Sequence, residues 1–284
     1  MTFTWIRLPL AEGAPTATAD TTETQIGTGY TVPTWAKSVK WVSYELIYAA
    51  LTTQEDCAGY LRIKDDANQI EPFYLPLPVA GSLATAAGTH FAKGISMPVE
   101  LPLTAEDTLR AYVNLDSATT GVPEIACYML ITDQSPKYRE HSVMSTLQTA
   151  STTQATAAAG GTLTTLARKC KNLHAIGGYV SIGAGDTAAQ TQGGYIKISS
   201  QIPGWVDQRI KTNYIPSGLG TDVDGVTKPF LCCGVDKLPY VEGFYKSLWP
   251  GFPVQGRNDF TIVSYMDDTN TVAPTYRVFL YFHE

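Results

Sequence analysis

The sequence has few charged side chains and no long apolar run, and each shortage excludes a class of protein. Charged residues make up 16% of the 284 residues, with 20 Lys and Arg against 26 Asp and Glu. Sequence-specific nucleic-acid binding needs concentrated Lys and Arg, so we expect none. Residues 1–10 have no basic start followed by an apolar stretch, and no apolar run reaches about 18 residues. We therefore expect neither a signal peptide nor a transmembrane helix.

Histidine and cysteine are also scarce. The four histidines, His90, His141, His174 and His283, are spaced without a metal-ligand pattern. No acids, bases and nucleophiles form a catalytic constellation in the sequence, which indicates a protein that is not an enzyme and uses no cofactor. The five cysteines include no CxxC pair. Buried free thiols, made in a reducing cytoplasm, are the favoured interpretation.

The adjacent carboxylates Asp65 and Asp66 stand at the end of a predicted strand. Short polar side chains favour turns, and successive residues point in different directions. We therefore expect a turn here rather than a general acid/base pair.

What the chain does have is the composition of a folded β protein. Hydrophobic residues make up 44%, and 16 Tyr, 24 Gly and 17 Pro accompany frequent Thr. Tyr and Thr favour pleated strands, while Gly and Pro favour the turns between them. No segment shows a long 3.6-residue period, so the composition predicts an all-β fold.

The two halves of the chain repeat one another. Residues 101–133 can be laid on residues 252–284 at a constant offset of 151 without a gap. In both copies alternating apolar residues predict a strand, an Asp-to-Pro turn follows, and a final strand is apolar at nearly every position. Earlier, Gly59–Lys64 matches Gly194–Ser199, and we align Ala36-Lys37 with Ala167-Arg168.

The repeat predicts two domains. We expect a first β-barrel with an extended N-terminal segment at 1–141, an uncharged extended linker at 142–167, and a second β-barrel at 168–284. Several short strands with turn signals, repeated twice, favour two tandem antiparallel eight-stranded jelly-roll barrels from an internal duplication. Immunoglobulin-like sandwiches are the structural alternative.

With this duplication, the chain resembles the double jelly-roll major capsid proteins of tailless icosahedral viruses, the lineage that includes adenovirus. The resemblance implies a homotrimer that acts as a pseudo-hexagonal tile in the virion capsid, after synthesis in the host cytoplasm. It also implies penton or minor capsid proteins as partners, and an internal membrane as a surface that the tile could face.

The second half contains an aromatic stretch that could anchor contacts between subunits, because aromatic side chains bury large areas at modest entropic cost. The candidate interface residues are Trp205, Tyr214, Phe230, Tyr240, Phe244, Tyr245 and Trp249. Packing of these residues on their own barrel is an equal alternative. The alternative function is a phage protein with tandem β-sandwiches that binds a receptor or glycan. A cupin-like enzyme ranks last, because a His-x-His motif is absent.

Overall fold

The computed structural model describes residues 1–8, 23–48, 59–70, 72–77, 90–91, 95–115, 123–149, 158–159, 163, 170–181, 194–203, 207–211, 228–233, 252–254, 260–266 and 275–284. Within these ranges the regular structure is all β, and the strand pairings are antiparallel. The prediction of an all-β fold is confirmed. Over the same residues, no helix is long and apolar enough to cross a membrane.

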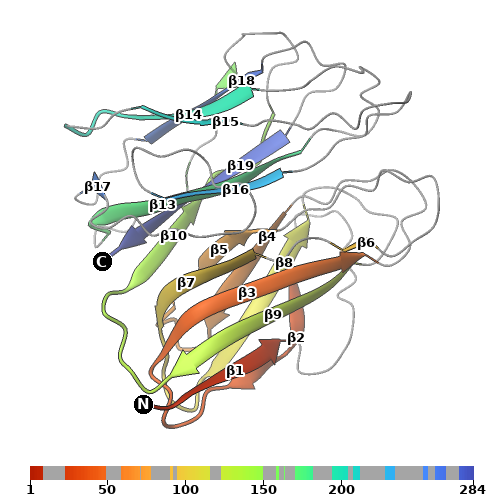
Figure 1. Cartoon of the computed structure of the whole chain (residues 1–284), viewed down its shortest axis with the longest axis vertical. Helices are drawn as coiled ribbons and strands as arrows, with labels where there is room; N and C mark the ends of the chain where they lie inside the picture. Colours follow the sequence, from red (N-terminus) through yellow and green to blue (C-terminus); the bar gives the residue numbers. More distant parts are fainter. Residues whose placement is uncertain are drawn as a thin grey trace.

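The first half folds as two sheets packed face to face (Figure 1). One sheet has the strand order β1-β9-β3, and β3 also pairs with β6 and β7 on its other edge. These strands are β1 (Phe3–Leu8), β9 (Pro123–Thr132), β3 (Ser38–Tyr48), β6 (His90–Phe91) and β7 (Ile95–Pro102). The other sheet has the order β2 (Thr24–Thr31), β8 (Thr108–Leu115), β4 (Gly59–Asp65) and β5 (Phe73–Pro76).

The second half has the same two-sheet plan. One sheet has the order β10 (Glu140–Met144), β19 (Thr275–His283), β13 (Asn172–Ser181) and β16 (Lys228–Cys233), with β11 (Gln148–Thr149) on β19 and β17 (Phe252–Pro253) on β13. The other has the order β12 (Ala158–Ala159), β18 (Phe260–Met266), β14 (Gly194–Ser200) and β15 (Gln208–Lys211). The segment 142–167, expected as an extended linker, thus includes β11, β12 and the end of β10, all paired with strands of the second half.

The two halves also agree in register. Gly59 of β4 pairs with Leu115 of β8, and Gly194 of β14 pairs with Met266 of β18. Leu115 and Met266 are 151 residues apart, the offset of the sequence repeat. The same agreement holds between β3 and β9 and between β13 and β19, including a β-bulge that skips one residue in each half. The bulged residues are Lys40 and His174.

One part of the sequence alignment is wrong. The backbone N–H of Lys37 donates to the carbonyl of Thr132, and that of Lys171 donates to the carbonyl of His283, both at 2.8 Å. Lys37 therefore corresponds to Lys171 and not to Arg168. Many residue types are compatible with the position just before a strand, so the sequence there does not define the register. The backbone hydrogen bonds do define it.

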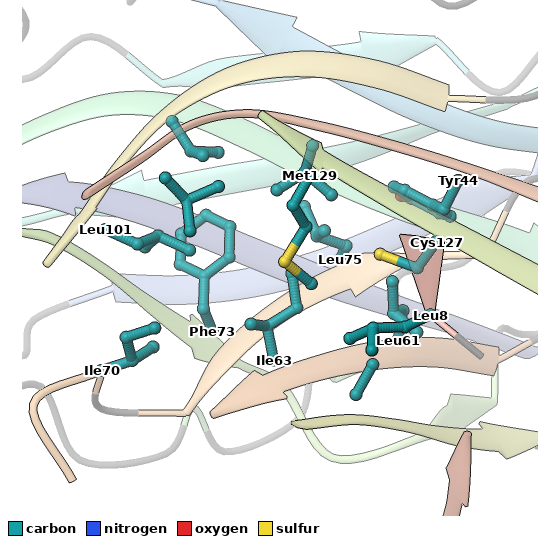
Figure 2. Close-up of a cluster of buried hydrophobic side chains, with 14 of the residues drawn as sticks. Leu8, Tyr44, Leu61, Ile63, Ile70, Phe73, Leu75, Leu101, Cys127 and Met129 are labelled. Carbon is teal, nitrogen blue, oxygen red and sulfur yellow. The ribbon is translucent and has the colours of Figure 1, made fainter. Parts of the chain in front are cut away.

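The first core lies between the two sheets of the first half. Alternate residues of β9, from Ile125 through Cys127 and Met129 to Ile131, are fully buried. Leu61 and Ile63 of β4 reach the same layer from the opposite sheet, as Figure 2 shows. Cys127 in this core and Cys170 are both buried, and neither forms a disulfide, as the sequence predicted. Burial raises the pKa of the Cys127 thiol to about 12.

The final strand, β19, is buried on both faces. Its residues Tyr276, Val278, Leu280 and Phe282 belong to the core of the second half. Phe279 and Tyr281 point the other way and belong to the core cluster of the first half. The two halves therefore share a continuous apolar contact.

The turn after β4 depends on one buried carboxylate. Asp65 is 1% exposed, and its oxygens accept the backbone N–H groups of Gln69, at 3.1 Å, and Ile70, at 2.8 Å. Desolvation raises the pKa of this carboxyl group, while the two N–H donors oppose that rise. Asp66 instead makes a two-point contact with the guanidinium of Arg110 on the surface. The prediction of a turn is confirmed.

We expect Asp65→Asn to lower the free energy of unfolding by about 1–3 kcal/mol, because the amide group replaces one of the two acceptor oxygens with a donor and leaves the N–H of Gln69 or of the buried Ile70 without an acceptor. The control, Asp66→Asn, changes an exposed pair and should have little effect. Urea unfolding of both variants measures the difference. Equal losses in the two variants would contradict the role of Asp65.

Candidate functional site

The contact between the halves joins a sheet face to a sandwich edge. Strands β5 and β7, at one edge of the first sandwich, contact the β10-β19-β13 sheet (Figure 1). The ring of Phe73 lies 5.6 Å from that of Tyr281, and the backbone N–H of Tyr74 donates to the Ser142 hydroxyl at 2.6 Å. Ala175 and Met144 complete the apolar contact.

The first half exposes the corresponding face of its own sheet. Leu130 of β9 pairs with both Trp5 of β1 and Trp41 of β3, so the three side chains form a row across the outer face. Trp5 is 53% exposed and Trp41 36%, and Phe3 next to the row is 63% exposed. We call these four residues, Phe3, Trp5, Trp41 and Leu130, the outer aromatic face. Clusters of large exposed apolar residues mark interaction surfaces.

Register relates this outer aromatic face to the contact between the halves. By the paired positions, Leu130 corresponds to Tyr281, Trp41 to Ala175 and Trp5 to Ser142. Tyr281, Ala175 and Ser142 are all covered by the first half. The face that the second half buries within the chain is thus the face that the first half leaves exposed.

A cluster of buried polar residues lies beside this contact. Glu140 of β10, His174 of β13 and His283 of β19 come from three adjacent strands, and each is at most 4% exposed. One carboxylate oxygen and one imidazole nitrogen from each histidine lie within 4.8 Å of one another. His174 Nε2 lies 2.8 Å from Glu140 Oε1. The β-bulge at His174 turns this side chain toward the cluster.

The imidazole of His283 is held between two rings. Its centroid is 3.8 Å from that of His174, in a stacked arrangement, and 3.6 Å from that of Tyr138. Burial, together with a smaller effect of the neighbouring His174, lowers the pKa of His283 to about 3. His283 is therefore neutral near pH 7, with one ring nitrogen carrying a lone pair.

Glu140 connects the cluster to the first half. Its second carboxylate oxygen, Oε2, accepts the backbone N–H of Glu100 in β7 at 2.9 Å. The Glu100 side chain in turn contacts Lys40 Nζ at 2.5 Å and accepts the backbone N–H of Lys137 at 3.0 Å. A continuous polar network thus runs from the bulge of the first half to the cluster in the second.

The predicted interface residues fall mainly outside the described part of the chain. Those outside it are Trp205, Tyr214, Tyr240, Phe244, Tyr245 and Trp249. Phe230 lies in β16, where its backbone pairs with Gly178 of β13. The role of these aromatics at an interface therefore stays a prediction.

Sequence reasoning missed both the buried cluster and the outer aromatic face. The spacing of the histidines along the chain predicts no metal site, yet His174 and His283 meet because β13 and β19 are paired. The signal that could have found them is the repeat itself, since it makes the β13–β19 pairing predictable. Trp5 and Trp41 could have been found from their outward positions in alternating strands.

No family model matches this chain, and none of the curated proteins matches it significantly. Similar solved structures include PNGase F, a glycosylasparaginase of Flavobacterium meningosepticum, with 10% identity, 100% of this chain and 96% of that chain covered, and a TM-score of 0.43. They also include viral capsid proteins. The major capsid protein P2 of bacteriophage PM2 has 9% identity, 99% and 97% coverage and a TM-score of 0.37. For the Sputnik virophage the values are 7%, 99%, 85% and 0.27.

These comparisons correct one prediction. The prediction that the chain is not an enzyme is wrong, because the solved structures that match along nearly its whole length include a glycosylasparaginase. At these identities and TM-scores the likenesses assign no activity and no substrate to this chain. Its function has to be argued from its own geometry.

We expect Glu140→Ala to lower the free energy of unfolding by about 3–5 kcal/mol, because it removes one member of a buried polar group and the acceptor of the Glu100 N–H. Glu140→Gln keeps a carbonyl acceptor for that N–H and should cost distinctly less. Chemical denaturation of both variants checks the order. A loss for Glu140→Gln as large as that for Glu140→Ala would show that the backbone acceptor contributes nothing.

Proposed function

We propose that this protein is a major capsid protein with two jelly-roll domains, which assembles as a trimer into an icosahedral virion shell. The observation that carries the proposal is the correspondence between the face that the second half buries and the face that the first half exposes. This correspondence provides a contact that can be repeated from one chain to the next.

The jelly-roll assignment is supported by strand order. Eight strands in two four-stranded antiparallel sheets, joined in this crossed order, are the arrangement of a jelly roll. In the first half these are β1-β9-β3-β7 and β2-β8-β4-β5, and the second half has β10-β19-β13-β17 and β12-β18-β14-β15. The shared registers and the shared bulge support an internal duplication. We place the boundary between the domains in residues 133–139, just before β10.

The trimer is supported by the kind of contact that joins the two halves. A face-to-edge contact is heterologous, so repetition of it makes a ring when the rotation closes. In the proposed ring, the outer aromatic face of one chain covers the β15 edge of the next. Six domains from three chains would then alternate around a pseudo-sixfold axis.

The chemistry of the β15 edge is compatible with this partner. Strand β15 corresponds in register to β5, the strand that contacts the second half within the chain. Arg209 of β15 is exposed, and its guanidinium lies 5.2 Å from the ring of Tyr195. An Arg on an aromatic surface can stack on further rings, and the Trp side chains of the outer aromatic face would provide them.

In a shell these trimers would pack beside one another, with penton or minor capsid proteins at the vertices and the inner ends of the domains toward the virion interior. An internal membrane is one surface that those ends could meet. No sequence-specific nucleic-acid contact is part of the proposal.

We expect the purified chain to be a trimer, with a mass near three times 30.7 kDa, and Trp5→Ser with Trp41→Ser to dissociate it. Central aromatic anchors contribute about 2 kcal/mol or more each, so each substitution should weaken association about 30-fold or more. Light scattering coupled to size exclusion measures the mass. Electron microscopy of the wild type at micromolar concentration should then show hexagonal arrays or shells.

Leu147→Ser is the matched control, because Leu147 is 37% exposed and lies outside the outer aromatic face. This variant should remain trimeric. A wild-type chain that stays monomeric at micromolar concentration would refute the assembly proposal, as would a trimer that survives loss of both Trp side chains. A monomer or trimer that binds glycans saturably and forms no shell would point to the receptor-binding alternative.

A further inference from the structure

We propose that Glu140, His174 and His283 bind one divalent transition-metal ion of the zinc type. The ion would join β10, β13 and β19 where the second half meets the first. This site is independent of the trimer and of the outer aromatic face.

The ligand set selects the class of metal. Two imidazole nitrogens and one carboxylate oxygen are ligands that Zn²⁺ and its neighbours in the first transition series accept. Calcium and magnesium prefer oxygen ligands throughout, and this cluster offers an oxygen from one side chain alone.

The spacing is compatible with such an ion. With metal–ligand bonds of about 2.0–2.2 Å in a tetrahedral arrangement, ligand atoms lie about 3.4 Å apart. In this structure the three atoms lie within 4.8 Å, and Glu140 and His174 already approach to 2.8 Å. The His174 and His283 rings stack with their centroids 3.8 Å apart, so both rings would turn for their in-plane lone pairs to converge on one ion.

The surrounding residues orient the ligands. Glu140 Oε2 is held by the Glu100 N–H, which leaves Oε1 directed at His174. The Tyr138 ring packs on His283 from the side opposite His174. Outer contacts of this kind commonly fix metal ligands and tune their affinity.

The first half provides an internal comparison. The positions that correspond to Glu140, His174 and His283 are Phe3, Lys40 and Thr132. The same backbone, with the same bulge, thus holds no ligand set in the first half. The cluster is a property of these three side chains and is not imposed by the fold.

Burial indicates a structural ion. The three residues are at most 4% exposed, so an ion here would cross-link strands out of contact with bulk solvent, with one buried water as its fourth ligand. Because Glu140 is also bonded to the first half, the ion would stiffen the joint between the domains.

The test uses the full chain with His283→Phe, which keeps a ring stacked on Tyr138 while it removes the nitrogen ligand. The control, His141→Phe, removes another buried imidazole that lies beside Glu284 and outside the cluster. Elemental analysis after growth with added zinc should find one ion per chain in wild type and in His141→Phe. Metal should be lost from His283→Phe, with Co²⁺ affinity lowered more than about 100-fold, since even outer-shell changes cost 10–100-fold.

Spectroscopy of the wild type keeps the proposal falsifiable if a variant does not fold. After treatment with a chelator, Co²⁺ should give the intense visible absorption of a four-coordinate site, and Zn²⁺ should displace it and raise the melting temperature. A wild-type chain that binds neither ion stoichiometrically would overturn the proposal. So would His283→Phe protein that binds Co²⁺ as tightly as wild type.

Discussion

The structure depends on the burial of β19 on both faces. One face closes the core of the second sandwich, and the other places Phe279 and Tyr281 against the first. The strand also lies between β10 and β13, so its backbone groups are paired on both edges. A strand in this position accepts almost no polar substitution, which explains why 275–283 is nearly continuous in apolar side chains. Residues of β19 belong to the core of the second sandwich, to the contact between the halves and to the cluster of Glu140, His174 and His283.

The two halves differ where their surroundings differ. Most described positions that face each half's own core are apolar in both halves, and Ser264 in place of Val113 is an exception. The outer positions differ between the halves: Ala175 and Ser142 are small, which allows close approach within the chain, and Ser142 accepts a hydrogen bond from the backbone N–H of Tyr74. Their counterparts Trp41 and Trp5 are large and exposed. Large side chains suit a contact with a second molecule. Association loses translational and rotational entropy, and burial of a large apolar area offsets that loss.

The all-β fold and the repeat of 101–133 in 252–284 could be predicted, because alternation of apolar residues needs residue types alone. The sequence alignment pairs Lys37 with Arg168, three residues before its structural equivalent Lys171. Residue types near a bulge do not reveal which backbone groups form hydrogen bonds. The sequence predicts a linker from Ser142 onward, because the run 142–167 has no charged side chain. The boundary therefore divides β10, whose Glu140 and Ser142 both bond to the first half. The cluster of Glu140, His174 and His283 was hidden because its members meet through strand pairing.

The buried polar residues give the joint a specificity that apolar contact does not have. Apolar faces can slide, because the free energy of burial depends mainly on area. A carboxylate that must meet both a backbone N–H of β7 and an imidazole of β13 can do so in one register. A one-residue slip of β10 would exchange the sides of Glu140 and His141 and leave the Glu100 N–H buried without its acceptor. Glu140 therefore fixes how the second half sits on the first, and with it the direction in which the outer aromatic face points.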